Sequence, residues 1–135
     1  MNAVNGLVTV SSPLDAVATI HWLETTLAAK GVTIFGKVDH AAGAQAVGLA
    51  LGPTTVLIFG NAQAGTKLMQ IDQRIGIDLP LKFLVWTGAD GKTHVSYNDP
   101  VWIAARYGIT PEAAPVLTAM QGMMKGLADG LSAAR

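Results

Sequence analysis

Five polar side chains stand where apolar segments of this chain begin or end, and their types could do chemistry. They are Asp39, His40, Asn61, Asp78 and Asn98. A histidine near a carboxylate can act as a general acid or base, and amide and carboxylate groups can hold a polar ligand. Each also has a structural explanation, because Asp and Asn cap helices and accept hydrogen bonds from loop backbone. The sequence therefore indicates a candidate ligand-binding site, in which Asp39 would also be an N-cap.

Other kinds of chemistry find no support in the sequence. There is no cysteine, no phosphate-binding loop of the G-x-x-x-x-G-K-[ST] or G-x-G-x-x-G type, and no G-x-S-x-G nucleophile motif. The three histidines, His21, His40 and His94, are not spaced as metal ligands. We therefore predict no metal site, and the sequence identifies no cofactor and no catalytic residue set.

Composition limits the class of protein. The chain has 135 residues, of which 50% are hydrophobic and 13% charged, so it can bury one sizeable core. Nine basic and nine acidic residues cancel, which argues against a nucleic acid or membrane surface as partner. No apolar run approaches the roughly 18 residues of a membrane span, and the N-terminus does not resemble a secretory signal. We expect one cytoplasmic domain over residues 1–135.

Apolar segments separated by turn signals predict five strands and five helices. We expect strands at 7–10, 32–38, 54–59, 81–87 and 92–97, and helices at about 13–30, 40–50, 67–72, 100–108 and 111–134. This order predicts an α+β fold with one five-stranded mixed sheet, helices packed on it and a long C-terminal helix. If the second and third strands are parallel and the fourth runs against them, the five candidate residues meet at one sheet edge. The single-site hypothesis depends on that topology.

The last predicted helix carries two stripes. Its apolar seam follows a 3-4-3-4 spacing and consists of Leu117, Met120, Met124, Leu127 and Leu131. Gly122, Gly126 and Gly130 recur every four residues, and each glycine costs a helix about 1 kcal/mol relative to alanine. Two interpretations account for the glycines. Either they fit the helix onto its own sheet, or they form a ridge at which two copies of the chain meet.

Several short motifs, in order, resemble those of one family. They are Val38-Asp39-His40-Ala41, Gly52-Pro53-Thr54, Phe59-Gly60-Asn61, Gly65-Thr66, Leu68-Met69, Asp78-Leu79-Pro80-Leu81-Lys82, Gly91-Lys92 and Tyr97-Asn98-Asp99-Pro100. In order and spacing they resemble domain-of-unknown-function family 302, over residues 32–100 and more weakly back to residue 7. Ala62 departs from the proline that this family usually has there. The resemblance implies an α+β fold over a core of about 7–108 and a homodimer, and it implies no activity.

We therefore predict a homodimeric module that binds a small ligand at a polar site formed by the five residues. One alternative is an enzyme in which His40 is the acid or base and Asp78 its electrostatic partner. The other is an assembly protein without catalytic activity that uses the helix at 111–134.

Overall fold

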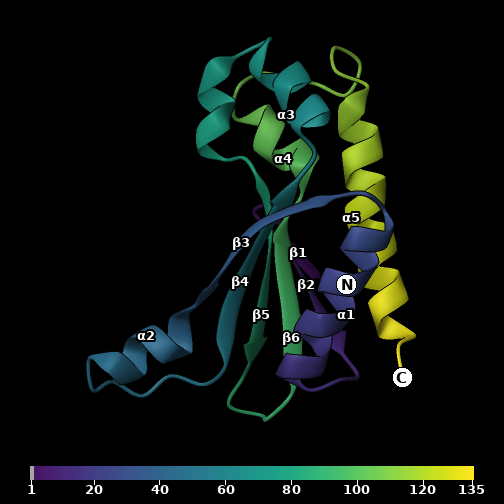
Figure 1. Ribbon diagram of the computed structural model, residues 1–135. Helices are drawn as coiled ribbons and strands as arrows, with labels where there is room; N and C mark the ends of the chain where they lie inside the picture. Colours follow the sequence, from purple (N-terminus) through teal and green to yellow (C-terminus); the bar gives the residue numbers. More distant parts are fainter. Residues whose placement is uncertain (1) are drawn as a thin grey trace.

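The computed structural model describes residues 2–135 as a sheet with helices along one face and at one end, and with a short helix that projects from the opposite side (Figure 1). The strands are β1 (Asn2–Val4), β2 (Leu7–Ser12), β3 (Thr33–Asp39), β4 (Thr54–Gly60), β5 (Leu81–Thr87) and β6 (Thr93–Asn98). The helices are α1 (Ala16–Ala29), α2 (His40–Ala46), α3 (Ala62–Met69), α4 (Pro100–Ala105) and α5 (Val116–Ser132), with a 3-10 turn, η1 (Gln73–Ile77). The predicted α+β fold with a long C-terminal helix is confirmed.

The sheet is antiparallel throughout, in the order β1-β2-β6-β5-β4-β3, so the predicted mixed sheet is wrong. The five expected strands are present, and β1 adds a short sixth that pairs with β2. A parallel β3–β4 pair would need a crossover that carries the chain back along the whole strand. In the structure residues 40–53 turn back instead: α2 ends at Ala46, and Asp39 pairs with Thr55 at the start of β4. The chain therefore leaves β3 and enters β4 at the same end of the sheet.

Helices α1 and α5 cover one face of the sheet. They lie side by side in Figure 1, where α1 contacts β3 and β5 and α5 contacts β2. Phe59, Phe83 and Tyr97 are buried beneath them, with the Phe59 and Phe83 rings stacked 5.0 Å apart between centroids and Tyr97 meeting Phe83 edge-on at 5.6 Å. These aromatic contacts join the three strands β4, β5 and β6 into one core.

Side chains of alternate residues point to the opposite face, which we call the outer face. Its apolar members are half-buried: Val56, Ile58, Leu84 and Trp86. The Trp86 indole N–H donates to Ser96 Oγ at 2.9 Å, and its ring lies 4.5 Å from that of His94. In Figure 1 neither α1 nor α5 lies on this side, and α2 projects from it away from the rest of the molecule.

Short capping signals determine where the helices begin. Asp39 accepts a hydrogen bond from the backbone N–H of Ala42 at 2.9 Å, so its predicted N-cap role is confirmed. Asp99 caps α4 in the same way, with Pro100 as the first helical residue. The first helix begins at Ala16, later than the predicted residue 13, because Asp15 is its N-cap.

The predicted seam of α5 is confirmed, because Leu117, Met120, Met124, Leu127 and Leu131 are all buried. The glycines differ from one another. A Cβ added at Gly130 would lie 3.2 Å from the Trp22 ring, whereas one added at Gly122 or Gly126 would meet no atom within 4 Å. Only Gly130 is therefore fitted to the chain's own surface.

This difference predicts that Gly126→Ala stabilises the protein. The substitution removes backbone freedom from the unfolded chain and adds a methyl group in open space, so the free energy of unfolding should rise by about 0.5–1 kcal/mol. Gly130→Ala is the matched control and should gain less, because the new methyl group meets Trp22. Urea denaturation with an unchanged m-value measures both. A loss of stability in Gly126→Ala would instead show that another surface packs on this ridge.

Candidate functional site

The five predicted site residues are divided between the two ends of the sheet. Asp39 pairs with Thr55 at the start of β4, and Asn61 follows Gly60 at the end of β4. Asp78 and Asn98 lie at the same end as Asn61, because β5 begins there and β6 ends there. The length of β4 puts the two groups about 20 Å apart. A single pocket lined by all five residues is therefore wrong, and the error follows from the antiparallel β3–β4 pair.

His40 is the first residue of α2, a helix with no buried residue. Its side chain is exposed, and Asp78 is at the far end of the sheet. The pairing required by the enzyme hypothesis, His40 with Asp78, is absent from this geometry. Asn98 is also exposed, at the last position of β6, where it pairs with Leu7.

Asp78 has partners that link two parts of the chain. It accepts hydrogen bonds from the Tyr107 hydroxyl and from Arg106 Nη1, the latter at 3.2 Å. The hydrogen bond to the carboxylate raises the pKa of Tyr107, because the phenol donates it only while protonated. Asp78 therefore connects the end of η1 to the end of α4. It does not line the cavity that contains Asn61.

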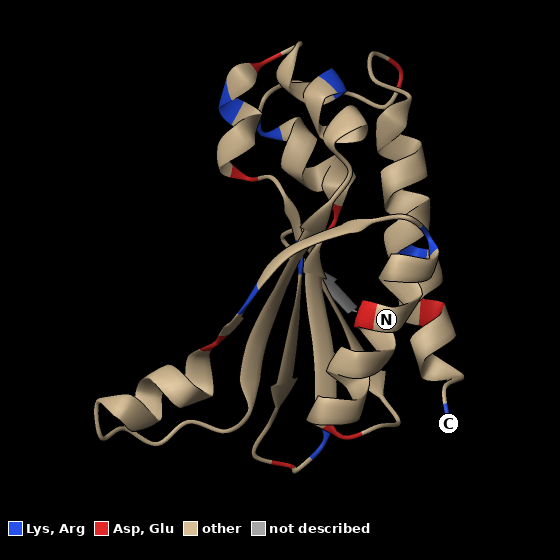
Figure 2. Ribbon diagram, in the orientation of Figure 1, with Lys and Arg blue, Asp and Glu red and all other residues tan. Residues whose placement is uncertain are grey.

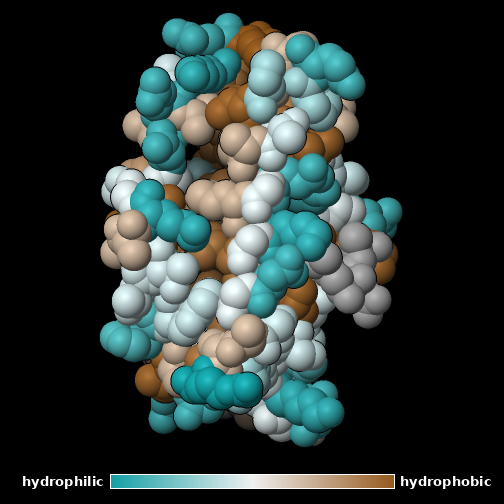
Figure 3. All heavy atoms as spheres, turned by 90° about the vertical axis from the view of Figure 1, so that its right-hand side faces the viewer, coloured by the Kyte–Doolittle hydropathy of each residue, from teal (hydrophilic) through white to brown (hydrophobic). Residues whose placement is uncertain are grey.

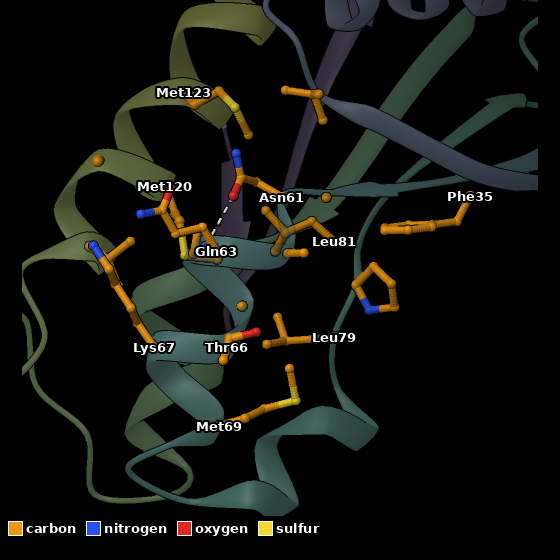
Figure 4. Close-up of a pocket in the computed structure, with 18 of the residues that line it drawn as sticks. Phe35, Asn61, Gln63, Thr66, Lys67, Met69, Leu79, Leu81, Met120 and Met123 are labelled. Atoms are coloured by element: carbon orange, nitrogen blue, oxygen red, sulfur yellow. Dashed lines mark hydrogen bonds between the residues drawn. The ribbon is translucent and has the colours of Figure 1, made fainter.

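Asn61 lines a groove of about 560 Å³ that is open to solvent. We call this cavity the groove. It lies between α3, the first half of α5 and the segments at the start of β3 and β5, and Figure 4 shows the residues that line it. In Figure 3 the surface beside α5 is hollowed near apolar side chains. Its large apolar members are Phe35, Met69, Leu79, Leu81, Met120 and Met123. The groove is therefore mostly apolar, with a few polar groups at its rim.

The polar groups of the groove come from α1 and α3. Asn61 caps α3, and its Oδ1 accepts from the backbone N–H of Ala64 at 3.1 Å, as the dashed line in Figure 4 shows. Because the cap uses Oδ1, the amide Nδ2 is the group left to donate to a ligand. Lys30, at the end of α1, and Lys67, in α3, supply two ammonium groups, and no carboxylate lines the groove.

Sequence reasoning found one residue of this site and missed the rest. Asn61 was predicted because of its place after a strand. Met120 was predicted only as a member of the apolar seam of the last helix. Nothing in the sequence places Phe35, Lys30 or Lys67 beside them, since these residues come from separate elements that only the tertiary packing brings together. Within residues 2–135, no group of three or more His, Asp or Glu side chains is arranged to hold a metal ion.

Comparison with known proteins extends these observations. A family model described as "Domain of unknown function DUF302" matches residues 8–127, which includes most of α5 and so reaches beyond the motifs at 32–100. The crystal structure of an uncharacterized conserved protein DUF302 from Bacillus stearothermophilus superposes with a TM-score of 0.83 at 20% identity, covering 93% of this chain and 98% of that chain. That likeness shows the fold alone.

The curated relatives carry a different name. Fluoride-specific ion channel FluC 1 of Brucella suis is 44% identical over 105 residues, which is 78% of this chain and 41% of that protein. The protein of the same name from Brucella abortus is also 44% identical, with 39% of its length covered. The chain thus spans about two fifths of the length of these relatives. In the part of the chain that the structure describes, no helix has the length and apolarity needed to cross a membrane.

Proposed function

The chain belongs to the DUF302 family of domains of unknown function, and from that premise we propose that it is a homodimeric, cytoplasmic module that binds a small ligand in the groove. The observation that supports binding is the groove itself. Its volume of about 560 Å³ lies within the range of roughly 300–1,000 Å³ that small-molecule sites occupy. A mostly apolar wall with a few polar groups at the rim is the usual composition of such sites.

The walls of the groove combine fixed and adaptable parts. Leu81 and Met120 are buried and belong to the core, so they fix one side. Met69 and Met123 are half-buried, and the unbranched methionine side chain can adjust to the shape of a ligand. Asn61 is held in place by its own cap. These features favour binding of one ligand with modest rearrangement.

The experiment that tests this proposal fills the groove from within. A Cβ added at Gly65 would lie 3.7 Å from Met69 Cε and 3.9 Å from Leu79 Cδ1, which are ordinary contacts. The remainder of a leucine side chain would therefore enter the groove. We expect Gly65→Leu to bind the uncharged apolar dye Nile red at least tenfold more weakly than the natural chain in a fluorescence titration, with an unchanged circular dichroism spectrum.

Gly126→Leu is the matched control, because it also adds a leucine to a helix but at a position open to solvent. It should bind Nile red like the natural chain. Equal dye binding by Gly65→Leu and the natural chain, or no binding by the natural chain, would show that the groove is not a ligand site.

The homodimer in this proposal uses the arm, which we define as residues 40–53, together with the outer face of the sheet. Residues 40–66 contain no Asp, Glu, Lys or Arg, and α2 carries neither blue nor red in Figure 2. Val47, Leu49 and Leu51 on the arm are 71%, 67% and 52% exposed. A projecting, uncharged segment with exposed large side chains is typical of a surface that another protein covers.

A second copy of the chain suits this surface. A stable interface takes about 800 Å² from each partner. The outer face adds Val56, Ile58 and Leu84 beside the arm, on the side of the sheet opposite α1 and α5. In a two-fold dimer each arm would lie on the outer face of its partner, so that both apolar surfaces are buried at once.

Ion conduction is not part of the proposal. The Brucella proteins named as fluoride channels are more than twice the length of the segment that matches this chain. The similarity relates this chain to a portion of those proteins, and their printed name describes the whole.

A further inference from the structure

The charges around the groove are of one sign. Lys30 and Lys67 both line it, and no Asp or Glu does. In the part of the chain that the structure describes, neither lysine takes part in an ion pair; Lys82 and Lys92 have none either, but they do not line the groove. Two exposed, unpaired ammonium groups at an apolar cavity favour a negatively charged ligand group.

One of the two charged side chains of the groove, Lys67, is separated from Phe35. In Figure 4 Lys67 extends from α3 in the direction of α5, on one side of the groove, while Phe35 lies on the opposite side with Leu79 and Leu81 between them. The Asn61 Nδ2 group adds an uncharged donor near Met123. This arrangement provides for a ligand with a charged head and an apolar tail, the tail lying toward Phe35.

We propose that the groove binds an amphipathic anion, a carboxylate with an unbranched alkyl tail, with Lys67 at the carboxylate, Lys30 as a second positive charge lining the groove, and the leucine and phenylalanine side chains along the tail. This inference rests on the proposed function, because it names the class of ligand for the same groove. A lysine ammonium binds an oxyanion through charge-assisted hydrogen bonds. Burial of each methylene group of the tail removes apolar surface from water and should tighten binding about fourfold.

Titration calorimetry of the full chain with decanoate, decanol and decyltrimethylammonium tests the head group. We expect decanoate to bind at least tenfold more tightly than either of the other two. Octanoate should bind about tenfold or more weakly than decanoate, because it lacks two methylene groups. Decanol binding as tightly as decanoate, or decyltrimethylammonium binding more tightly, would overturn the proposed ligand class.

Lysine variants test the residue assignment. Lys67→Ala should weaken decanoate binding about five- to tenfold and leave decanol binding unchanged. Lys67→Arg should retain most of the affinity for decanoate. Lys92→Ala, in the exposed turn between β5 and β6, is the matched control and should bind decanoate like the natural chain. Unchanged decanoate affinity in a Lys30→Ala/Lys67→Ala double variant would overturn the proposal.

The two proposals fail separately. If Nile red binding is lost in Gly65→Leu while the natural chain shows no preference for decanoate, the groove is a ligand site and only the anionic class is wrong. If Nile red does not depend on Gly65, the groove itself is rejected, and the ligand class is rejected with it.

Discussion

Phe83→Ala should reduce the free energy of unfolding by about 3–5 kcal/mol. Phe83 has no exposed surface, and its ring stacks on Phe59 and meets the edge of Tyr97. Removal of the ring loses its burial and leaves a cavity at the point where β4, β5 and β6 share one core. Because most domains are stable by only about 5–15 kcal/mol, this one substitution should remove a large part of the stability. Urea denaturation followed by circular dichroism measures the change.

Phe35→Ala is the matched control, because it makes the same chemical change at a side chain that is 55% exposed. It should cost less than about 1 kcal/mol of stability. The same variant should bind Nile red more weakly than the natural chain, because Phe35 lines the groove. Similar losses of stability in the two variants would show that the core does not centre on the stacked pair.

The local features of this fold could be predicted because each depends on neighbours in sequence. Asp39 accepts its capping hydrogen bond from a backbone N–H only three residues later in the chain. The buried seam of α5 follows from the helical spacing of its apolar residues. Strand direction depends instead on how far a connection can reach. Residues 40–53 are enough to reach either end of β4, so the sequence alone does not decide the direction of the β3–β4 pair.

The site was harder to predict than the fold, because its parts come from elements that are far apart in the sequence. Asn61 could be predicted as a polar residue after a strand. Its neighbours in the groove, Leu79 and Met123, are remote in sequence and give no pattern that joins them to it. Asp78 shows the opposite case. Its partners Arg106 and Tyr107 follow 28 and 29 residues later in the sequence. Because Asp78 accepts hydrogen bonds from both, it connects η1 to the end of α4 and is not a ligand-binding residue of the groove.

A Leu49→Asp/Leu51→Asp double variant should convert the proposed dimer to a monomer. Both leucines are more than half exposed on the arm, so they contribute little to the fold of a single chain. At a two-fold interface each substitution would place two carboxylates on apolar surface, and burial of an unpaired charge costs several kcal/mol. We expect the sedimentation coefficient of the variant to fall from that of a dimer to that of a monomer, with an unchanged circular dichroism spectrum.

Val17→Asp provides the control, because Val17 is 79% exposed on α1, on the covered side of the sheet and away from the arm. It should sediment like the natural chain. The glycine ridge of α5 offers the competing interface, and Gly126→Leu distinguishes the two. If Gly126→Leu is monomeric and the double variant is dimeric, the chains meet through α5. If the natural chain is itself a monomer at micromolar concentration, the uncharged arm needs a partner other than a second copy.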